Sequence, residues 1–217
     1  MVAILVLATF VVLIAVDYFL HREKYQFPVV GSEAAAAPAE SAAGVSLPAA
    51  LAYHPGHTWA LNEGNGHIRV GVDEFAAALL GQIDHLDLPK RGRWLQQGDR
   101  GWTVFTDHGP VNMPAPAEGE VIAINEKALL NPGLVENDPY NSGWLIEIRS
   151  PEADVNFRNL LSGNLAMRWM EDSVSALRKA TGAQGAAVPK TDGIQPHMGS
   201  QLQEDEWTSL TSQFFRC

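Results

Sequence analysis

The sequence is poor in cysteine and in clustered positive charge. Cys217 is the only cysteine among 217 residues, which excludes a disulfide framework, a thiolate zinc site and a cysteine-ligated iron–sulfur cluster. The 15 basic residues are outnumbered by 25 acidic ones, and the formal net charge is -10. No stretch gathers enough lysine and arginine to neutralise several phosphates, so we expect no nucleic-acid partner.

The sequence also lacks the short motifs of common enzymes. It contains no Gly-x-Ser-x-Gly and no His-Glu-x-x-His. Aspartate and glutamate are scattered through turn-like segments, a distribution typical of solvated surface. Four of the 7 histidines could be grouped as a metal site, but their spacing matches no ligand motif: His54, His57, His67 and His108. We therefore expect a protein that is not an enzyme and has no catalytic residues, no metal and no cofactor.

The first long feature is an apolar run at the N-terminus. Residues 2–16 are apolar except for one threonine, and the run continues to residue 20. About 20 helical residues span roughly 30 Å, the thickness of the hydrocarbon core of a bilayer. Nothing basic precedes the run and no small-residue cleavage site follows it, which argues against a signal peptide. Residues 1–24 are therefore predicted to form an uncleaved single-pass anchor.

Positive charge on one side of this anchor predicts its orientation. Arg22 and Lys24 follow the span and nothing basic comes before it, so the N-terminus is expected outside and the main domain in the cytoplasm, at a bacterial inner membrane. Asp17 and Tyr18 lie at the inner boundary. They are candidate contacts to a partner helix, although Asp17 can equally extend toward the headgroups.

Two linkers are predicted from composition. Residues 25–52 are rich in alanine and proline and show no amphipathic period. Residues 183–203 likewise hold glycine, proline and alanine without periodicity.

The middle of the chain, residues 53–150, has the pattern of short strands separated by turns. Asn65-Gly66 is a strong hairpin signal, and the strand after it alternates apolar and polar residues. Asp73 is placed to cap a short helix over 73–80. Further strands are expected at 83–88, 102–105, 120–125 and 144–148. Many short strands with one small helix predict a compact sandwich or barrel.

Six separated groups of residues stand out in this region: His57-Thr58-Trp59; Gly71-Val72-Asp73-Glu74-Phe75 with Leu80-Gly81; Leu88-Pro89 with Gly92; Gly98-Asp99; Pro116 to Val121; and Leu134 to Tyr140 with Gly143-Trp144-Leu145. In this order along the chain, they resemble the glycine cleavage system H-protein family. The resemblance implies a mainly β, lipoyl-domain-like hybrid barrel-sandwich. With the two ends of the chain, the expected fold is this barrel-sandwich with an N-terminal transmembrane helix and a C-terminal helical extension.

The resemblance breaks at the residue that would carry the lipoyl group. In the family, a lysine at the tip of a hairpin lies at a fixed spacing before the proline of Pro-x-x-Gly-Glu. Counting back by that spacing from Pro116 ends on His108, and residues 103–115 contain no lysine. An imidazole cannot form the lipoyl amide, so the lipoyl position is occupied by His108 and no lipoyl cofactor is expected.

Two helices are predicted beyond the barrel-sandwich. Residues 151–182 form a helical extension, in which 164–181 carries an apolar stripe at helical spacing. Residues 183–217 hold the second linker and a terminal docking helix with an aromatic face: Trp207, Leu210, Phe214 and Phe215. Tryptophan and phenylalanine are frequent anchors in binding sites for helices. Docking on a partner and docking on the chain's own domain both remain open.

These patterns together predict a non-catalytic, membrane-anchored accessory subunit. It would dock and stabilise a larger membrane bioenergetic complex, of the photosynthetic reaction-centre or respiratory electron-transport type. Its partners would be integral membrane subunits and the lipid bilayer. The alternative is a carrier or redox-associated protein with an unusual modification or a metal at the His108 hairpin.

Overall fold

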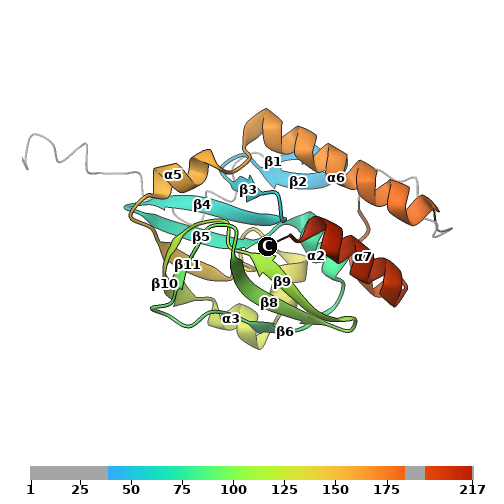
Figure 1. Cartoon of the computed structure of the whole chain (residues 1–217), viewed down its shortest axis with the longest axis horizontal. Coiled ribbons are helices and arrows are strands. Elements are labelled where there is room, and N and C mark those ends of the chain that lie inside the picture. Colours follow the sequence, from blue (N-terminus) through green and yellow to red (C-terminus); the bar gives the residue numbers. More distant parts are fainter. Residues whose placement is uncertain (1–38, 184–193, 217) are drawn as a thin grey trace, which may run out of the picture. The chain divides into compact units, whose positions relative to one another are not determined.

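The computed structural model describes residues 39–183 and 194–216 (Figure 1). The architecture is mainly β, as predicted, and its centre is a curled sheet of six strands in the order β3-β4-β5-β11-β10-β7. The strands of this sheet are β3 (Ala52–His54), β4 (Thr58–Gly64), β5 (His67–Val72), β7 (Trp94–Leu95), β10 (Gly119–Ile124) and β11 (Ile146–Arg149).

A second sheet of three strands contains the hairpin of interest. Its order is β6-β8-β9, with β6 (Ile83–Asp87), β8 (Arg100–Thr106) and β9 (Gly109–Pro114). β8 and β9 pair antiparallel up to Thr106 opposite Gly109. The two residues between them, Asp107 and His108, form the tip of the hairpin.

The turn and the helix cap that the sequence predicts are both present in the structure. Asn65 and Gly66 take left-handed φ angles of 54° and 76°, which suit the tight turn between β4 and β5. Asp73 caps α2 (Glu74–Leu80), since its Oδ1 accepts a hydrogen bond of 2.8 Å from the backbone N–H of Ala76. The residues of α2 after Glu74 are buried, so this short helix is part of the core.

The predicted linker before the barrel-sandwich contains structure that composition did not indicate. Residues 39–48 form a hairpin of β1 (Ala39–Ala42) and β2 (Val45–Pro48). Ala42, Val45 and Leu47 are buried. Ser46 ties the hairpin to the domain: its N–H donates to Glu74 Oε2 at 2.7 Å, and its carbonyl accepts from the Tyr140 hydroxyl at 2.7 Å.

Two short helices that the sequence did not predict, α3 (Glu126–Leu130) and α4 (Gly133–Asn137), connect β10 to β11. After them come α5 (Ala153–Arg158), the long α6 (Gly163–Ala183), the 3₁₀ turn η2 (Met198–Gln201) and α7 (Glu204–Phe214). The stripe of α6 is buried at Ala166, Met170, Val174 and Leu177. This helix lies over β1 and β2, while α7 lies beside α2 (Figure 1).

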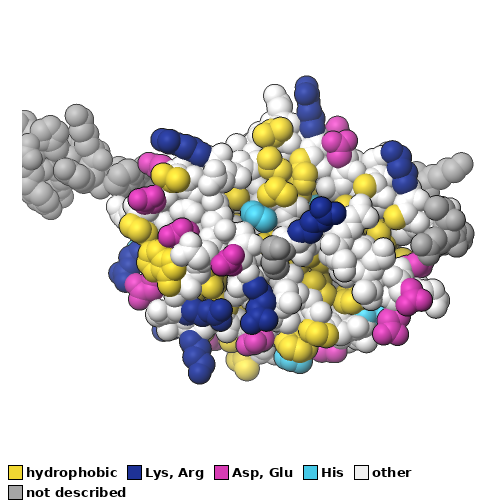
Figure 2. All heavy atoms as spheres, in the orientation of Figure 1, with side chains coloured by type: hydrophobic (Ala, Val, Ile, Leu, Met, Phe, Trp, Pro, Cys, Tyr) yellow, Lys and Arg dark blue, Asp and Glu magenta, His cyan; other side chains and the backbone are white. Residues whose placement is uncertain are grey.

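No helix among residues 39–183 and 194–216 is long and apolar enough to cross a membrane. The segment for which the anchor was predicted, residues 1–24, lies outside the described residues, and so do Asp17 and Tyr18. On the face shown in Figure 2, lysine and arginine side chains are interspersed with aspartate and glutamate, without a broad basic area.

Candidate functional site at the hairpin tip

The tip of the β8–β9 hairpin is held by its own hydrogen bonds. Thr106 Oγ1 donates to the carbonyl of Gly109 at 3.1 Å and accepts from the backbone N–H of His108 at 3.2 Å. Because the same hydroxyl ties both sides of the turn, the backbone at His108 is fixed relative to the two strands. The side chain at this position is therefore presented at a defined place.

The imidazole of His108 is half-buried because another part of the chain lies against it. Its ring stacks on Trp207, with ring centroids 5.0 Å apart and planes at 28°. Its Nε2 lies 3.2 Å from the carbonyl of Gly199, within hydrogen-bonding distance. Both contacts come from residues 194–216, which we call the covering segment.

The covering segment is anchored at the carboxyl end of α2. Trp207 Nε1 donates to the carbonyl of Leu79 at 3.0 Å, and Ser200 Oγ accepts from the N–H of Gln82 at 3.0 Å. The last carbonyls of a helix lack partners within it, so this tryptophan supplies one of the missing donors. Gly199 is packed so closely that an added Cβ would overlap the carbonyl of Leu79.

The predicted docking residues of the terminal helix all face the chain's own domain. Trp207, Leu210, Phe214 and Phe215 are each 8% exposed or less. Phe214 contacts Phe75 of α2 edge to face, with centroids 4.9 Å apart. In this structure the aromatic face of the terminal helix packs on the chain's own domain. The aromatic pattern located these residues, but it carried no information about which surface receives them.

A second histidine lies deeper, under the same segment. His57 is fully buried, and its Nδ1 is 2.9 Å from Asp73 Oδ2. Its ring is stacked on Phe75 at 4.1 Å and lies 4.6 Å from Trp169 of α6. The Nε2 atom of His57 is buried without a hydrogen-bond partner among the described residues. The sequence pattern indicated this residue, but not that the α6 and α7 aromatics enclose it.

The histidines that the structure describes do not gather into a metal site. His67 pairs with Glu147 at 2.7 Å, away from His57 and His108. Within residues 39–183 and 194–216, no group of three or more His, Cys, Asp or Glu side chains is arranged to hold a metal ion.

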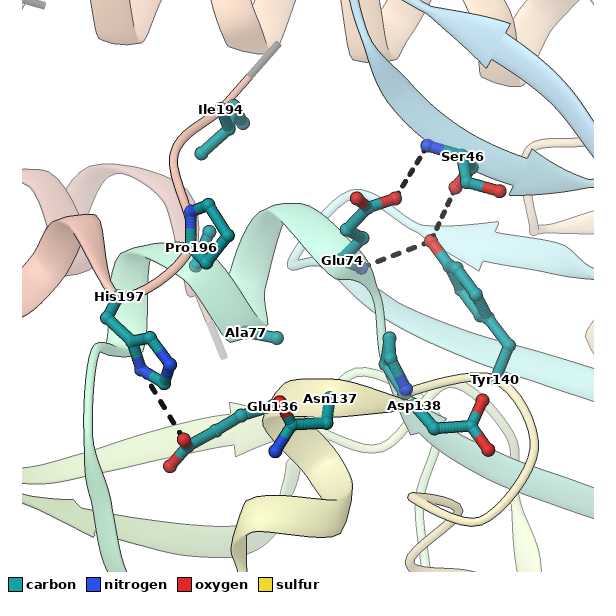
Figure 3. A pocket seen from close by; sticks show the side chains of 12 residues that line it. Ser46, Glu74, Ala77, Glu136, Asn137, Asp138, Tyr140, Ile194, Pro196 and His197 are labelled. Atoms are coloured by element: carbon teal, nitrogen blue, oxygen red, sulfur yellow. Dashed lines mark hydrogen bonds and ion pairs between the residues drawn. The ribbon is translucent and has the colours of Figure 1, made fainter.

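An acidic pocket of about 380 Å³ lies where the start of the covering segment meets α2 and α4 (Figure 3). Glu74, Glu136 and Asp138 line it together with Tyr140 and His197. Figure 3 shows Glu136 and His197 pointing toward each other, and Glu136 Oε2 is 3.4 Å from His197 Nδ1.

The carboxylates of this pocket are already engaged by the chain. Burial raises the pKa of Glu74 above its ordinary value, although the hydrogen bond from Ser46 acts in the opposite direction. For Asp138, burial acts to raise the pKa, but hydrogen bonds from Ser142 and Asn141 outweigh it and lower the pKa. Glu136 Oε1 accepts from the N–H of Ile83 at 2.6 Å. The pocket therefore joins the covering segment to the domain through structural contacts.

Comparisons with known proteins agree on one family. The family model described as glycine cleavage H-protein matches residues 51–173. The glycine cleavage system H protein of Idiomarina loihiensis is 37% identical over 119 residues, which are 55% of this chain and 92% of that protein. The one of Aeromonas salmonicida is 36% identical over 107 residues, 49% of this chain and 83% of that protein. A crystal structure of a glycine cleavage system H protein from Mycobacterium marinum aligns with a TM-score of 0.46 and 26% identity, over 48% of this chain and 87% of that one.

The matched range and the covering segment do not overlap. The match ends at residue 173, within α6, and the covering segment begins at residue 194. Because the aligned 119 residues already make up 92% of the Idiomarina relative, that relative is too short to contain a counterpart of this segment. The hairpin thus lies within the matched range, and its cover lies outside it.

The function and location predicted from the sequence are wrong. The relatives are named glycine cleavage system H proteins, which overturns the prediction of an accessory subunit in a photosynthetic or respiratory complex. The predicted inner-membrane location depended on that membrane complex and is overturned with it. Integral membrane partners find no support either. An apolar run of this length predicts at most a membrane-spanning segment and does not identify the complex to which a protein belongs.

Proposed function

We propose that this chain, which belongs to the glycine cleavage H-protein family, is a docking member of that family that carries no lipoyl group. It acts by binding proteins of a glycine cleavage system and performs no chemistry of its own. The observation that carries the proposal is the hairpin tip: His108, the residue that the family spacing predicts at the lipoyl position, is stacked on Trp207.

The chemistry of attachment supports this proposal. A stable lipoyl amide requires a primary amine, and an acylated imidazole is readily hydrolysed. The hairpin from Arg100 to Pro114 contains no lysine. Lys127 lies in α3, after the strand that follows the hairpin. No amine is therefore presented at the tip.

The packing of the tip supports it as well. A carrier group must leave its attachment point and reach the sites of several enzymes. The side chain of His108 is instead stacked on Trp207 and lies within hydrogen-bonding distance of the Gly199 carbonyl. The part of the family's function that remains is the recognition of other proteins by the surface around the hairpin.

The first test is the intact mass of the protein. The full chain is co-expressed with a lipoate–protein ligase and lipoate, with the Idiomarina loihiensis H protein as the positive control. We expect the control to gain one lipoyl group and this chain to keep its unmodified mass. A lipoyl group on any peptide of this chain would overturn the proposal.

The second test is binding. Purified components of a glycine cleavage system are titrated against the immobilised chain, and the unlipoylated Idiomarina protein serves as the comparison. We expect saturable binding of at least one component, with an affinity within about tenfold of the comparison protein, or ~1.4 kcal/mol. Absence of binding to all components would contradict the docking function even if the mass test succeeds.

A further inference from the structure

We infer that the covering segment is a built-in competitor for the hairpin face, so that a partner reaches this face only when the segment is displaced. This inference rests on the proposed docking function and concerns its regulation. The hairpin face is the surface formed by the tip at His108, the carboxyl end of α2 and the buried His57–Phe75 pair.

The covering segment contacts all three parts of the hairpin face. Trp207 covers the tip through its stack on His108. The same residue reaches the end of α2 through its hydrogen bond to Leu79. Phe214 then closes the inner part, with its ring 4.9 Å from Phe75 and 5.8 Å from His57. A partner that binds around the hairpin tip would have to occupy the space held by these two aromatic side chains.

The segment has the form of a helical ligand. In α7 the buried residues Trp207, Leu210, Thr211 and Phe214 lie at helical spacing, while the acidic residues of its first turn face outward or are half-exposed. Amphipathic helices that lie in a groove bind other proteins in this way, through anchors spaced by three and four residues. Because the ligand is part of the chain, it acts at an effective concentration of about millimolar, which suppresses competitors without any strong intrinsic affinity.

The segment is also suited to release. The helix α7 spans 11 residues, and its N-cap residue Gln203 makes no side-chain cap hydrogen bond. Isolated helices shorter than about 12–15 residues are marginal in water. Once α7 leaves the hairpin face, it loses its helical structure. It must therefore fold again in order to rebind. No strand of the described sheets comes from the covering segment.

The test is a peptide that competes with the segment. A fluorescent peptide of residues 194–216 is titrated against the full chain and against two full-length variants, with fluorescence anisotropy as the readout. Trp207→Ala weakens the in-chain competitor. Ser209→Ala changes an exposed residue of the same helix and is the matched control.

We expect Trp207→Ala to bind the peptide at least tenfold more tightly than the wild-type chain, because tryptophan anchors commonly account for ≥2 kcal/mol in such interfaces and a tenfold change is ~1.4 kcal/mol. Ser209→Ala should match the wild type, and a peptide that itself carries Trp207→Ala should not bind. Equal peptide affinity for Trp207→Ala and the wild type, or no binding to either, would overturn the inference. Far-ultraviolet circular dichroism verifies that the variant retains its sheets.

The partner assay then tests whether the covering segment competes with a partner for the hairpin face. Trp207→Ala should bind the glycine cleavage component about tenfold more tightly than the wild type, and Ser209→Ala should not, as the peptide experiment leads us to expect. An unchanged partner affinity in Trp207→Ala would overturn the inference and leave docking itself intact. The peptide test uses only this chain, so a failure of the proposed function in the mass or binding assays would not alter its outcome.

Discussion

Two histidines of this protein lie under the same segment but are held in different ways. His57 is fully buried, is paired with Asp73, and has aromatic rings from α2 and α6 against it. His108 is half-buried at a hairpin tip, and the ring stacked on it comes from α7. His57, Asp73, Phe75 and Trp169 all fall within the family match over residues 51–173, whereas the cover over His108 lies outside it. The difference separates a histidine that the shared fold fixes from one whose surroundings were added to that fold.

The largest expected effect is at the partner of His57. Asp73→Ala removes both the cap of α2 and the acceptor beside the His57 ring. A lost N-cap costs about 1 kcal/mol and a buried group left without its partner about 1–3 kcal/mol, so the free energy of unfolding should fall by about 2–4 kcal/mol.

Urea denaturation followed by tryptophan fluorescence measures this loss. Asp73→Asn is the control, since its amide oxygen can still cap the helix, and it should lose less. If Asp73→Ala unfolds at the wild-type urea midpoint, His57 is not fixed by this pair and the contrast between the two histidines fails.

A smaller and local effect is expected at His108. His108→Ala removes the stack on Trp207 and the contact to Gly199. An aromatic pair contributes about 0.5–1.5 kcal/mol beyond its buried area, so the covering segment should open more often while the urea midpoint of the domain changes little. Hydrogen exchange should therefore speed up in α7 and not in the strands of the large sheet.

His85→Ala is the matched control for that measurement. His85 stacks on Phe105 with centroids 4.0 Å apart, in the same sheet as the hairpin. Its removal deletes a similar ring pair without touching α7. If both variants speed exchange in α7 equally, the contact between His108 and Trp207 is not what holds the segment in place.

The smallest effect concerns pH at Glu74, where the covering segment and the domain share a pocket. Burial raises the pKa of Glu74 in the folded protein, while the unfolded chain has the ordinary value of about 4.3. Between these two values the folded state binds more protons than the unfolded state, so stability falls as pH rises through this window. The free energy of unfolding of Glu74→Gln should not fall in this window. Its difference from the wild-type value should therefore grow in favour of the variant from pH 4 to pH 7. If the free energies of unfolding of the two proteins change in parallel with pH, the raised pKa of Glu74 in the folded protein is contradicted.

The sequence predicted those features that depend only on residues close together in the chain. The Asn65-Gly66 turn, the Asp73 cap and the apolar stripes of α6 and α7 depend on neighbouring residues, and the structure confirms each of them. The hairpin β1–β2 was missed because alanine and proline are both depleted in strands. It is stabilised by burial under α6 and by bonds from Ser46 to distant residues.

The candidate site was only half predictable for a similar reason. Family spacing located His108 at the hairpin tip, and helical periodicity identified Trp207 as an anchor. Neither pattern could pair the two, because the residues that meet are about a hundred positions apart and periodicity reports only on one element at a time. The pairing depends on how α2 and the hairpin are placed by the complete fold.

The hydrogen bond from Trp207 to Leu79 joins a late part of the chain to an early part, and this separation matters during synthesis. Its two residues are separated by 128 positions, and His108 and Gly199 by 91. At a synthesis rate of about 5–20 residues per second, the hairpin emerges roughly 5–20 seconds before the helix that covers it. Each new molecule therefore passes through an interval in which the tip is uncovered, and an enzyme or chaperone that recognises the hairpin meets its target most readily on the nascent chain.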